Sequence, residues 1–308
     1  MAGQLWATST QGGYRYSPLL TREVMTAAQP DMRFTQFCEV REEWGRNAGE
    51  TFLFDKAGNI DTAGGTLTET STIPSHGYRL YQSTATMKER GNSIPWTKKY
   101  DVLAQTNDRK LPVKVLKNDM AKVLDIAAED EFDNCKIRYH GTASGGGSFS
   151  TSGTATATCG DHLDTYHTKQ IVDYLYQTMK AEPYDGQNYM AILSSSAARG
   201  MYDDVESILK YTKYPASGEF GRFYDCRFVK TNHGLDNTIG TANAFGEAYF
   251  FGGNEAPVLE GVAYAPEIIP KEVTDFGRSK GLAWYLINAY QIFWAADPDN
   301  NIVKYDST

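Results

Sequence analysis

The hydrophobic positions between residues 112 and 134 repeat with the period of an α-helix. Charged and polar residues separate seven apolar side chains: Val113, Leu116, Met120, Val123, Leu124, Ala127 and Phe132. Pro112 suits the first turn of a helix, where a missing N–H costs nothing. The pattern predicts the longest helix of the chain, with one buried stripe facing the strands that return after Ala244.

The apolar positions between residues 51 and 98 follow a β pattern instead. Three threonine-rich or aromatic segments (52–54, 67–70 and 78–81) are separated by Gly-Asn and Gly-Gly turn signals. We therefore expect a long, exposed β-hairpin. Because an isolated two-stranded hairpin is marginally stable in water, its stability should come from contacts outside it.

The segments that follow predict an α+β chain. Helical spacing covers 168–180, an apolar strand covers 189–193, and serines then cap a helical stretch that runs to Lys210. Residues 141–160, rich in glycine and serine, form either a flexible connection or a small β loop. Beyond Gly218 the chain is mostly β, while the apolar run 282–296 fits either a strand or a helix.

The first 49 residues show neither period. They hold few aliphatic side chains and six aromatic ones: Trp6, Tyr14, Tyr16, Phe34, Phe37 and Trp44. A segment of this kind has no core of its own. We therefore expect an arm that is held by neighbouring chains.

Composition narrows the classes of function. The chain has 308 residues, 41% hydrophobic and 22% charged, enough for two compact parts. Its net charge of −8 argues against a sequence-reading nucleic-acid binder. No signal-peptide pattern and no apolar run of membrane-spanning length is present, so no membrane role is expected. The four cysteines lie far apart and are interpreted as reduced thiols: Cys38, Cys135, Cys159 and Cys226.

One cluster has the composition of a metal site. Asp161, His162, Asp164 and His167 stand within two helical turns, a spacing at which imidazole and carboxylate groups converge on zinc. No third strong ligand site declares itself elsewhere in the sequence. We interpret the cluster as a solvated loop before a helix and assign no metal ligand.

Other reactive side chains have simpler interpretations. The serines 194–196 follow a strand but lack the Gly-x-Ser-x-Gly spacing of a nucleophile elbow, so they are expected to cap a helix. His140 and His233 have no nucleophile beside them in the sequence. The acidic run 129–131, with Asp133, is expected to be solvated or to contact a basic neighbour. No catalytic residue, cofactor-binding residue or cofactor is therefore expected.

The second half of the chain contains a series of ordered sequence blocks, at 189–193, 197–199, 203–204, 210–212, 218–223, 227–232, 244–249, 275–278 and 281–284. In their order and spacing these blocks resemble a family of tailed-phage major capsid proteins found in podoviruses and some siphoviruses. Two positions depart from the family pattern. Asp225 stands where a glycine is usual, although Asp tolerates the left-handed turn that a Tyr224-Asp225 hairpin requires. Tyr285 stands where a lysine is frequent, which puts a salt bridge there in doubt.

This resemblance implies the Hong Kong 97-type coat fold, an α+β fold. Its parts would be an N-terminal arm (1–49), an extended β-hairpin called the E-loop (50–98), a peripheral domain with a long spine helix (99–164 and 245–308) and an axial domain (165–244). The arm, hairpin, long helix and α+β module expected from the residues fall in the same order.

The implied function is that of a major capsid protein without enzymatic activity. Such a protein assembles as hexamers and pentamers into the icosahedral shell around phage double-stranded DNA. Its partners would be other copies of itself, a scaffolding protein, a portal and a decoration protein, and it would lie near DNA only non-specifically. It would be assembled in the host cytoplasm and located in the virion.

Three alternatives remain open at this point. An encapsulin-like nanocompartment shell protein has the same fold but needs a docking groove for cargo peptides, and the C-terminal blocks favour the phage family. A metal-dependent hydrolase would use the cluster at 161–167, which meets the geometric requirements of catalysis poorly. A tail or receptor-binding protein suits the tyrosine-rich composition, but no sequence repeat is visible.

Overall fold

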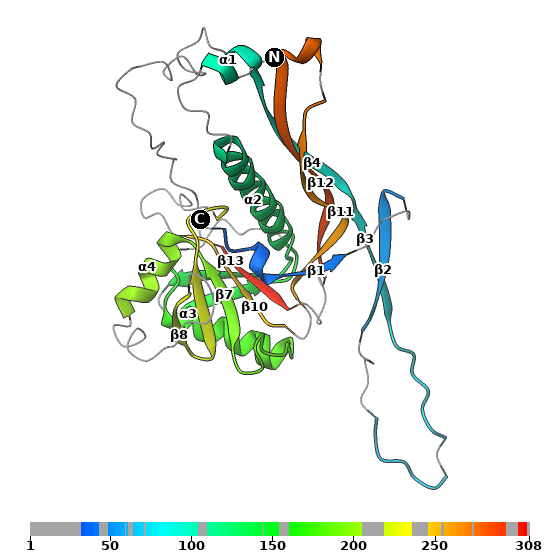
Figure 1. The fold of residues 1–308 in the computed structure, drawn as a ribbon. Coiled ribbons are helices and arrows are strands. Elements are labelled where there is room, and N and C mark those ends of the chain that lie inside the picture. The colour runs from blue at the N-terminus through cyan, green and yellow to red at the C-terminus, as the bar shows by residue number, and fades with distance from the viewer. Residues whose placement is uncertain are drawn as a thin grey trace.

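Three sheets, one long helix and several shorter helices make up the described part of the computed structural model (Figure 1). The structure describes residues 32–42, 49–58, 60, 64–70, 72–103, 110–143, 145–153, 160–204, 219–235, 246–253, 256–272, 274–293 and 301–306. A seven-stranded sheet with its helices forms one end of the molecule. A four-stranded sheet backed by the long helix forms the other, and a two-stranded hairpin projects to one side.

The seven-stranded sheet contains the main core. Its order is β6 (Gly146–Ser150), β5 (Arg138–Ala143), β13 (Ile302–Asp306), β10 (Ala248–Phe251), β7 (Tyr189–Leu193), β9 (Cys226–Lys230) and β8 (Glu219–Phe223). Every residue of β7, β10 and β13 is buried, because both faces of these central strands are covered. Helices α3 (Thr165–Asp173) and α4 (Ser195–Asp204) pack on this sheet, and α3 continues as a π-helical turn (Tyr174–Thr178). The predicted strand at 189–193 is confirmed.

The long helix α2 (Lys110–Asp133) joins two cores, and its prediction over 112–134 is confirmed. Leu116 packs on Trp284 and Leu286 of the four-stranded sheet, with Met120, Val123 and Leu124 partly buried beside them. Ala127 and Phe132 instead join the main core. The predicted stripe therefore faces the strands after Ala244, but it divides between two sheets.

The four-stranded sheet has the order β1 (Cys38–Glu42), β11 (Val258–Pro270), β12 (Ser279–Ile292) and β4 (Lys88–Thr97). Short helix α1 (Lys98–Leu103) follows β4, and a 3-10 turn (Asp275–Gly277) joins β11 to β12. The apolar run that fitted a strand or a helix is strand β12 over its described residues. Its burial pattern alternates along much of its length, as expected for a strand with one covered face.

The expectation that residues 1–49 lack a core is wrong for their described part. Phe34 precedes a 3-10 turn (Thr35–Phe37) and is buried against Phe132, and Phe37 ends that turn and is buried against Phe251. Strand β1, which follows, pairs in parallel with β11. The carboxylate of buried Asp125 accepts backbone N–H bonds from Arg33, Phe34 and Thr35 at 3.2, 2.9 and 3.1 Å. Residues 1–31 and 43–48 of the expected arm lie outside the described residues.

The predicted hairpin is confirmed for the antiparallel pair β2 (Thr51–Ala57) and β3 (Leu80–Thr86), but it ends earlier than expected. Strand β4 follows β3 directly and pairs with β12 instead, so residues 88–97 belong to the four-stranded sheet. The turn signals in the sequence indicate only that the chain reverses direction. They do not indicate which strand will pair with residues 88–97.

The remaining local predictions have clear outcomes. The described part of 141–160 contains the antiparallel pairing of β5 with β6, with Gly145 at a φ of +84°, and 144 and 154–159 lie outside the described residues. Tyr224 and Asp225 have φ values of 47° and 55° and turn β8 into β9, which confirms the left-handed hairpin turn. Helix α4 is described to Asp204, and 205–210 lie outside the described residues. Among the described helices, none has the length and apolar character needed to span a bilayer.

Candidate functional site

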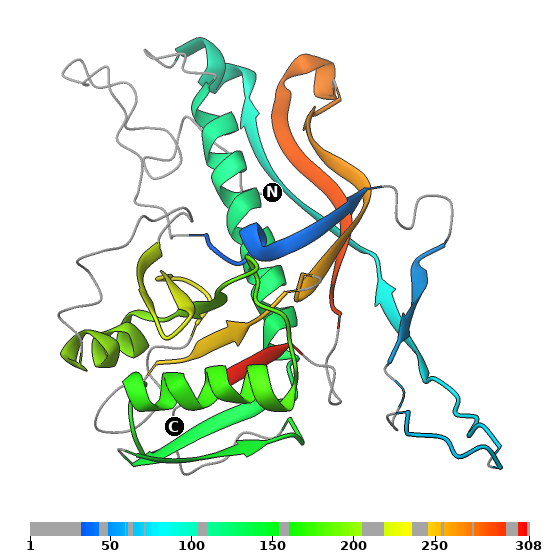
Figure 2. The same cartoon turned by 90° about the horizontal axis from the view of Figure 1, so that it is seen from below.

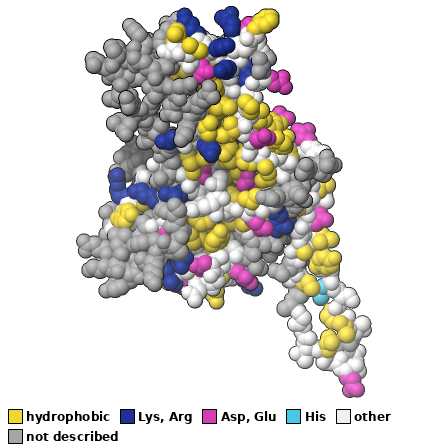
Figure 3. Space-filling view, viewed as in Figure 1, with side chains coloured by type: hydrophobic (Ala, Val, Ile, Leu, Met, Phe, Trp, Pro, Cys, Tyr) yellow, Lys and Arg dark blue, Asp and Glu magenta, His cyan; other side chains and the backbone are white. Residues whose placement is uncertain are grey.

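The β2–β3 hairpin exposes apolar side chains that nothing in the described chain covers. Ile73 is 71% exposed, and the same holds to a lesser degree for Leu53, Leu67, Tyr78 and Leu80. Figure 3 shows hydrophobic side chains at several places along the projection, among polar ones. Both outer edges of the pair lack a neighbouring strand among the described residues, so backbone groups remain available for pairing. These features are typical of a contact surface for another chain.

The base of the hairpin is fixed to the body. The rings of Phe54 and Phe293 stack with centroids 5.9 Å apart. Lys56 lies 5.5 Å from the centroid of each ring, and its ammonium donates to the backbone carbonyl of Phe293. Ala85 and Met87 pack with Ala289 of β12. The direction of the hairpin is therefore set by the end of β12.

A second exposed apolar feature lies at the opposite end of β12. Phe276 is fully exposed in the turn between β11 and β12, where Asp275 and Phe276 both adopt left-handed φ values of 51° and 50°. A groove of about 810 Å³ lies nearby, lined in part by Pro95, Ile269 and Trp284. The four-stranded sheet therefore has exposed apolar features near both ends of β12.

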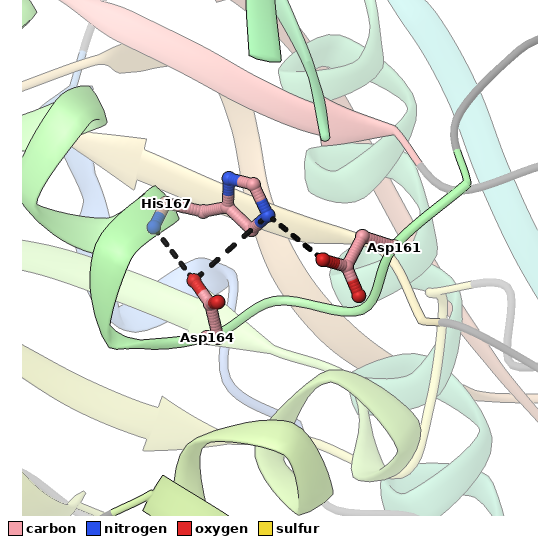
Figure 4. Close-up of side chains that lie close together, drawn as sticks. All are labelled: Asp161, Asp164 and His167. Atoms are coloured by element: carbon pink, nitrogen blue, oxygen red, sulfur yellow. Dashed lines mark hydrogen bonds and ion pairs between the residues drawn. The ribbon is translucent and has the colours of Figure 1, made fainter. Parts of the chain in front are cut away.

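The structure brings together three of the four residues of the sequence cluster. Nε2 of His167 lies 3.6 Å from Oδ2 of Asp161 and 3.9 Å from Oδ1 of Asp164 (Figure 4). Asp164 is the N-cap of α3 and accepts the backbone N–H of His167 at 2.7 Å. His167 is 0% exposed, so interpreting the whole cluster as a solvated loop is wrong. His162, in contrast, has a side chain 47% exposed.

The structure also places the serine and histidine candidates named from the sequence. Oγ of Ser194 accepts the backbone N–H of Ala197 at 3.2 Å, which confirms a serine cap at α4. His140 is buried in β5, and burial lowers its pKa. His233 follows β9, where its backbone N–H donates to the hydroxyl of Thr231.

A buried ionic network, which the sequence did not indicate, links the end of α2 to β13. Lys304 pairs with Glu247 at 3.1 Å and Asp306 at 3.6 Å and donates to Asp133, while Arg138 binds Asp306 at 2.7 Å. The contact to Asp133 confirms that the acidic run meets a basic neighbour. Burial, and then the nearby charges of acidic residues, raises the pKa of Glu129 to about 7. Lys304 lies far along the chain from Asp133 and Glu247, so no local pattern indicated the network.

The whole fold has close counterparts among solved structures. The capsid of Ralstonia phage GP4 matches with a TM-score of 0.70 at 11% identity, over 95% of each chain. The capsid of Helicobacter pylori bacteriophage KHP30 matches with a TM-score of 0.67 at 12% identity, over 95% of this chain and 96% of that one. The capsid of cyanophage P-SCSP1u matches with a TM-score of 0.65 at 10% identity, over 99% of this chain and 97% of that one. No protein-family model and no curated protein matches the sequence. The fold expected from the resemblance, the Hong Kong 97-type coat fold, is therefore confirmed.

Proposed function

We propose that this chain is the major capsid protein of a tailed bacteriophage and forms the icosahedral shell around its double-stranded DNA. The observation that carries the proposal is a hairpin that exposes several apolar side chains beyond its base and has no neighbouring strand on either outer edge among the described residues. Its fold matches phage capsid structures over nearly the full length of both chains. Burial of that hairpin on a neighbouring copy would satisfy both its edges and its apolar side chains.

The proposal assigns a role to each segment. Residues 1–49 would be the arm, of which 32–42 are built into the subunit, and 50–98 would include the E-loop. Residues 99–164 and 245–308 would form the peripheral domain, and 165–244 the axial domain. The seven-stranded sheet takes strands from both of these domains, so the two would act as one body within a subunit.

In a closed shell the individual contact surfaces can be modest. Each subunit would touch several copies in hexamers and pentamers, and closure of the lattice makes weak contacts collectively strong. Further partners would be a scaffolding protein, a portal and a decoration protein. The net charge of −8 supports only loose proximity to packaged DNA. The protein would catalyse no reaction, would assemble in the host cytoplasm and would reside in the virion.

Electron microscopy of hairpin variants tests the proposal. The full chain would be expressed alone and with its neighbouring genes and examined by negative staining for closed particles. Leu67→Asp with Ile73→Asp should keep the thermal transition of the parent, because both side chains are exposed, yet yield no closed shells.

The matched control keeps the apolar character of the same positions. Leu67→Ile with Ile73→Val should assemble as the parent chain does. The proposal fails if the parent chain forms no particle under either condition, or if the acidic double variant assembles normally.

A further inference from the structure

The gap between His167, Asp161 and Asp164 has the dimensions of an ion site. Hydrogen bonds to nitrogen span about 2.7–3.2 Å, so separations of 3.6 and 3.9 Å are too long for a direct bond from Nε2 to either carboxylate. Two ligands of a tetrahedral zinc, with bonds of about 2.0–2.2 Å, lie roughly 3.3–3.6 Å apart. The three ligand atoms all lie within 4.8 Å of one another. A small inward movement of Asp164 would complete the geometry.

A second observation points to a ligand in that gap. Nε2 of His167 is completely buried and has no hydrogen-bond partner among the residues that the structure describes. The other ring nitrogen, Nδ1, lies 2.9 Å from the hydroxyl of buried Tyr139. If Nδ1 donates to that oxygen, Nε2 carries the lone pair and aims it between the two carboxylates (Figure 4). Metal-binding histidines are held by this kind of bond at the other nitrogen.

The elements around the cluster hold the ligands in place before any ion binds. The carbonyl of Gly141 in β5 accepts the backbone N–H groups of Gly160 and Asp161 at 2.8 and 3.3 Å, and Tyr305 of β13 donates to the carbonyl of Asp161. A Cβ at position 141 would stand 3.0 Å from Nε2 of His167, so the glycine leaves space directly beside the nitrogen. Such positioning lowers the ordering cost of binding.

We propose that Asp161, Asp164 and His167 bind a divalent cation of the zinc class, with water completing a four-coordinate shell. Imidazole together with carboxylates favours zinc over magnesium, which prefers oxygen ligands alone. The ion would relieve repulsion between two adjacent carboxylates and cross-link the loop before α3 to the first turn of that helix. It would act as a structural tie, since all three ligands are largely or completely buried.

Zinc titration of the full chain, prepared without a histidine tag, tests this site. After treatment with a chelator and dialysis, the chain should take up one equivalent of Zn²⁺, with a thermal transition raised by about 5 °C at saturating metal. Magnesium at the same concentration should produce neither effect. Absence of stoichiometric zinc would overturn the proposal.

Two variants separate this site from a surface histidine site. Asp161→Asn keeps the backbone bonds of the loop and should match the parent chain in chelator, but bind zinc on the order of 100-fold more weakly. His162→Ala removes the adjacent exposed imidazole and should leave zinc binding unchanged. The reverse pattern, or unchanged binding in Asp161→Asn, would overturn the proposal. These readouts do not depend on shell formation, so this inference and the proposed function can fail independently.

Discussion

At the scale of single residues, the buried carboxyl groups at the end of α2 link stability to pH. The pKa of Glu129 rises from its ordinary value of 4.5 to about 7 in the folded chain. A folded state that binds a proton more tightly than the unfolded state is stabilised by that proton. This contribution is fully present below about pH 4.5 and is lost as the pH rises toward 7.

Glu129→Gln should remove this dependence. The variant should unfold like the parent at pH 4 and be more stable at pH 8 by about 1–2 kcal/mol, a figure reduced for the partial exposure of the side chain. Denaturant titrations at the two pH values measure the difference. Glu272→Gln makes the same change of charge at an exposed position and should show no such gain. Equal stability of parent and Glu129→Gln at pH 8 would contradict the prediction.

Single residues also mark where sequence reasoning ended. The spacing of Asp161, Asp164 and His167 was visible in the sequence, and the prediction of a segment before a helix is correct for Asp161 and Asp164, while His167 lies in the first turn of α3. Their burial was not visible, because it depends on Tyr139 and Gly141 of a strand about 20 residues earlier. The burial of Asp125 could not be predicted from the sequence either, since an acidic residue within a helical pattern is normally solvated.

At the scale of elements, α2 carries the contact between the two sheets. Leu124 lies partly buried where the main core meets the Leu116–Trp284 cluster. Leu124→Asp should place a charge without a partner between the two cores and cost about 3 kcal/mol or more, enough to produce misfolded, aggregated protein.

A charge reversal on the exposed side of the same helix provides the comparison. Lys117→Asp should give soluble protein with a normal thermal transition, because Lys117 is exposed. Soluble yield and thermal unfolding distinguish the two variants. Identical behaviour would mean that α2 is not the structural spine of the subunit.

The elements that sequence predicted best have a long and regular pattern. Helix α2 repeats over several turns and β7 is uniformly apolar, so both were identified from the residues alone. Strand β1 and the 3-10 turn before it are short, and their few aromatic residues follow no period. Strand β4 was predicted only as part of the hairpin, and its pairing with β12 joins segments nearly 200 residues apart. Local patterns do not specify such partners.

At the scale of the whole molecule, the first described residues are part of the subunit. Deletion of 1–48 would remove Phe34 and Phe37 from the core, take β1 from the sheet and leave the buried carboxylate of Asp125 without its three N–H donors. The truncated chain should therefore fail to fold.

Soluble expression and circular dichroism test the truncation. Arg41→Ala is a suitable control, because it changes an exposed side chain of β1 and should leave the fold intact. A soluble, cooperatively folding truncated chain would contradict the prediction and return residues 32–42 to the status of an independent arm.

The attachment of the hairpin to the end of β12 has a mechanical consequence. β12 has 14 residues, about 45 Å of extended chain, and the hairpin projects onward from its end (Figure 1). Because β3 leads directly into β4, a pull on the hairpin would load β4 along its own axis, against its antiparallel neighbour β12. The hydrogen bonds between these two strands would then bear the tension in shear, many together, instead of opening one after another. In the proposed shell, a pull of internal pressure on the hairpin would thus be resisted by the whole length of the β4–β12 pair.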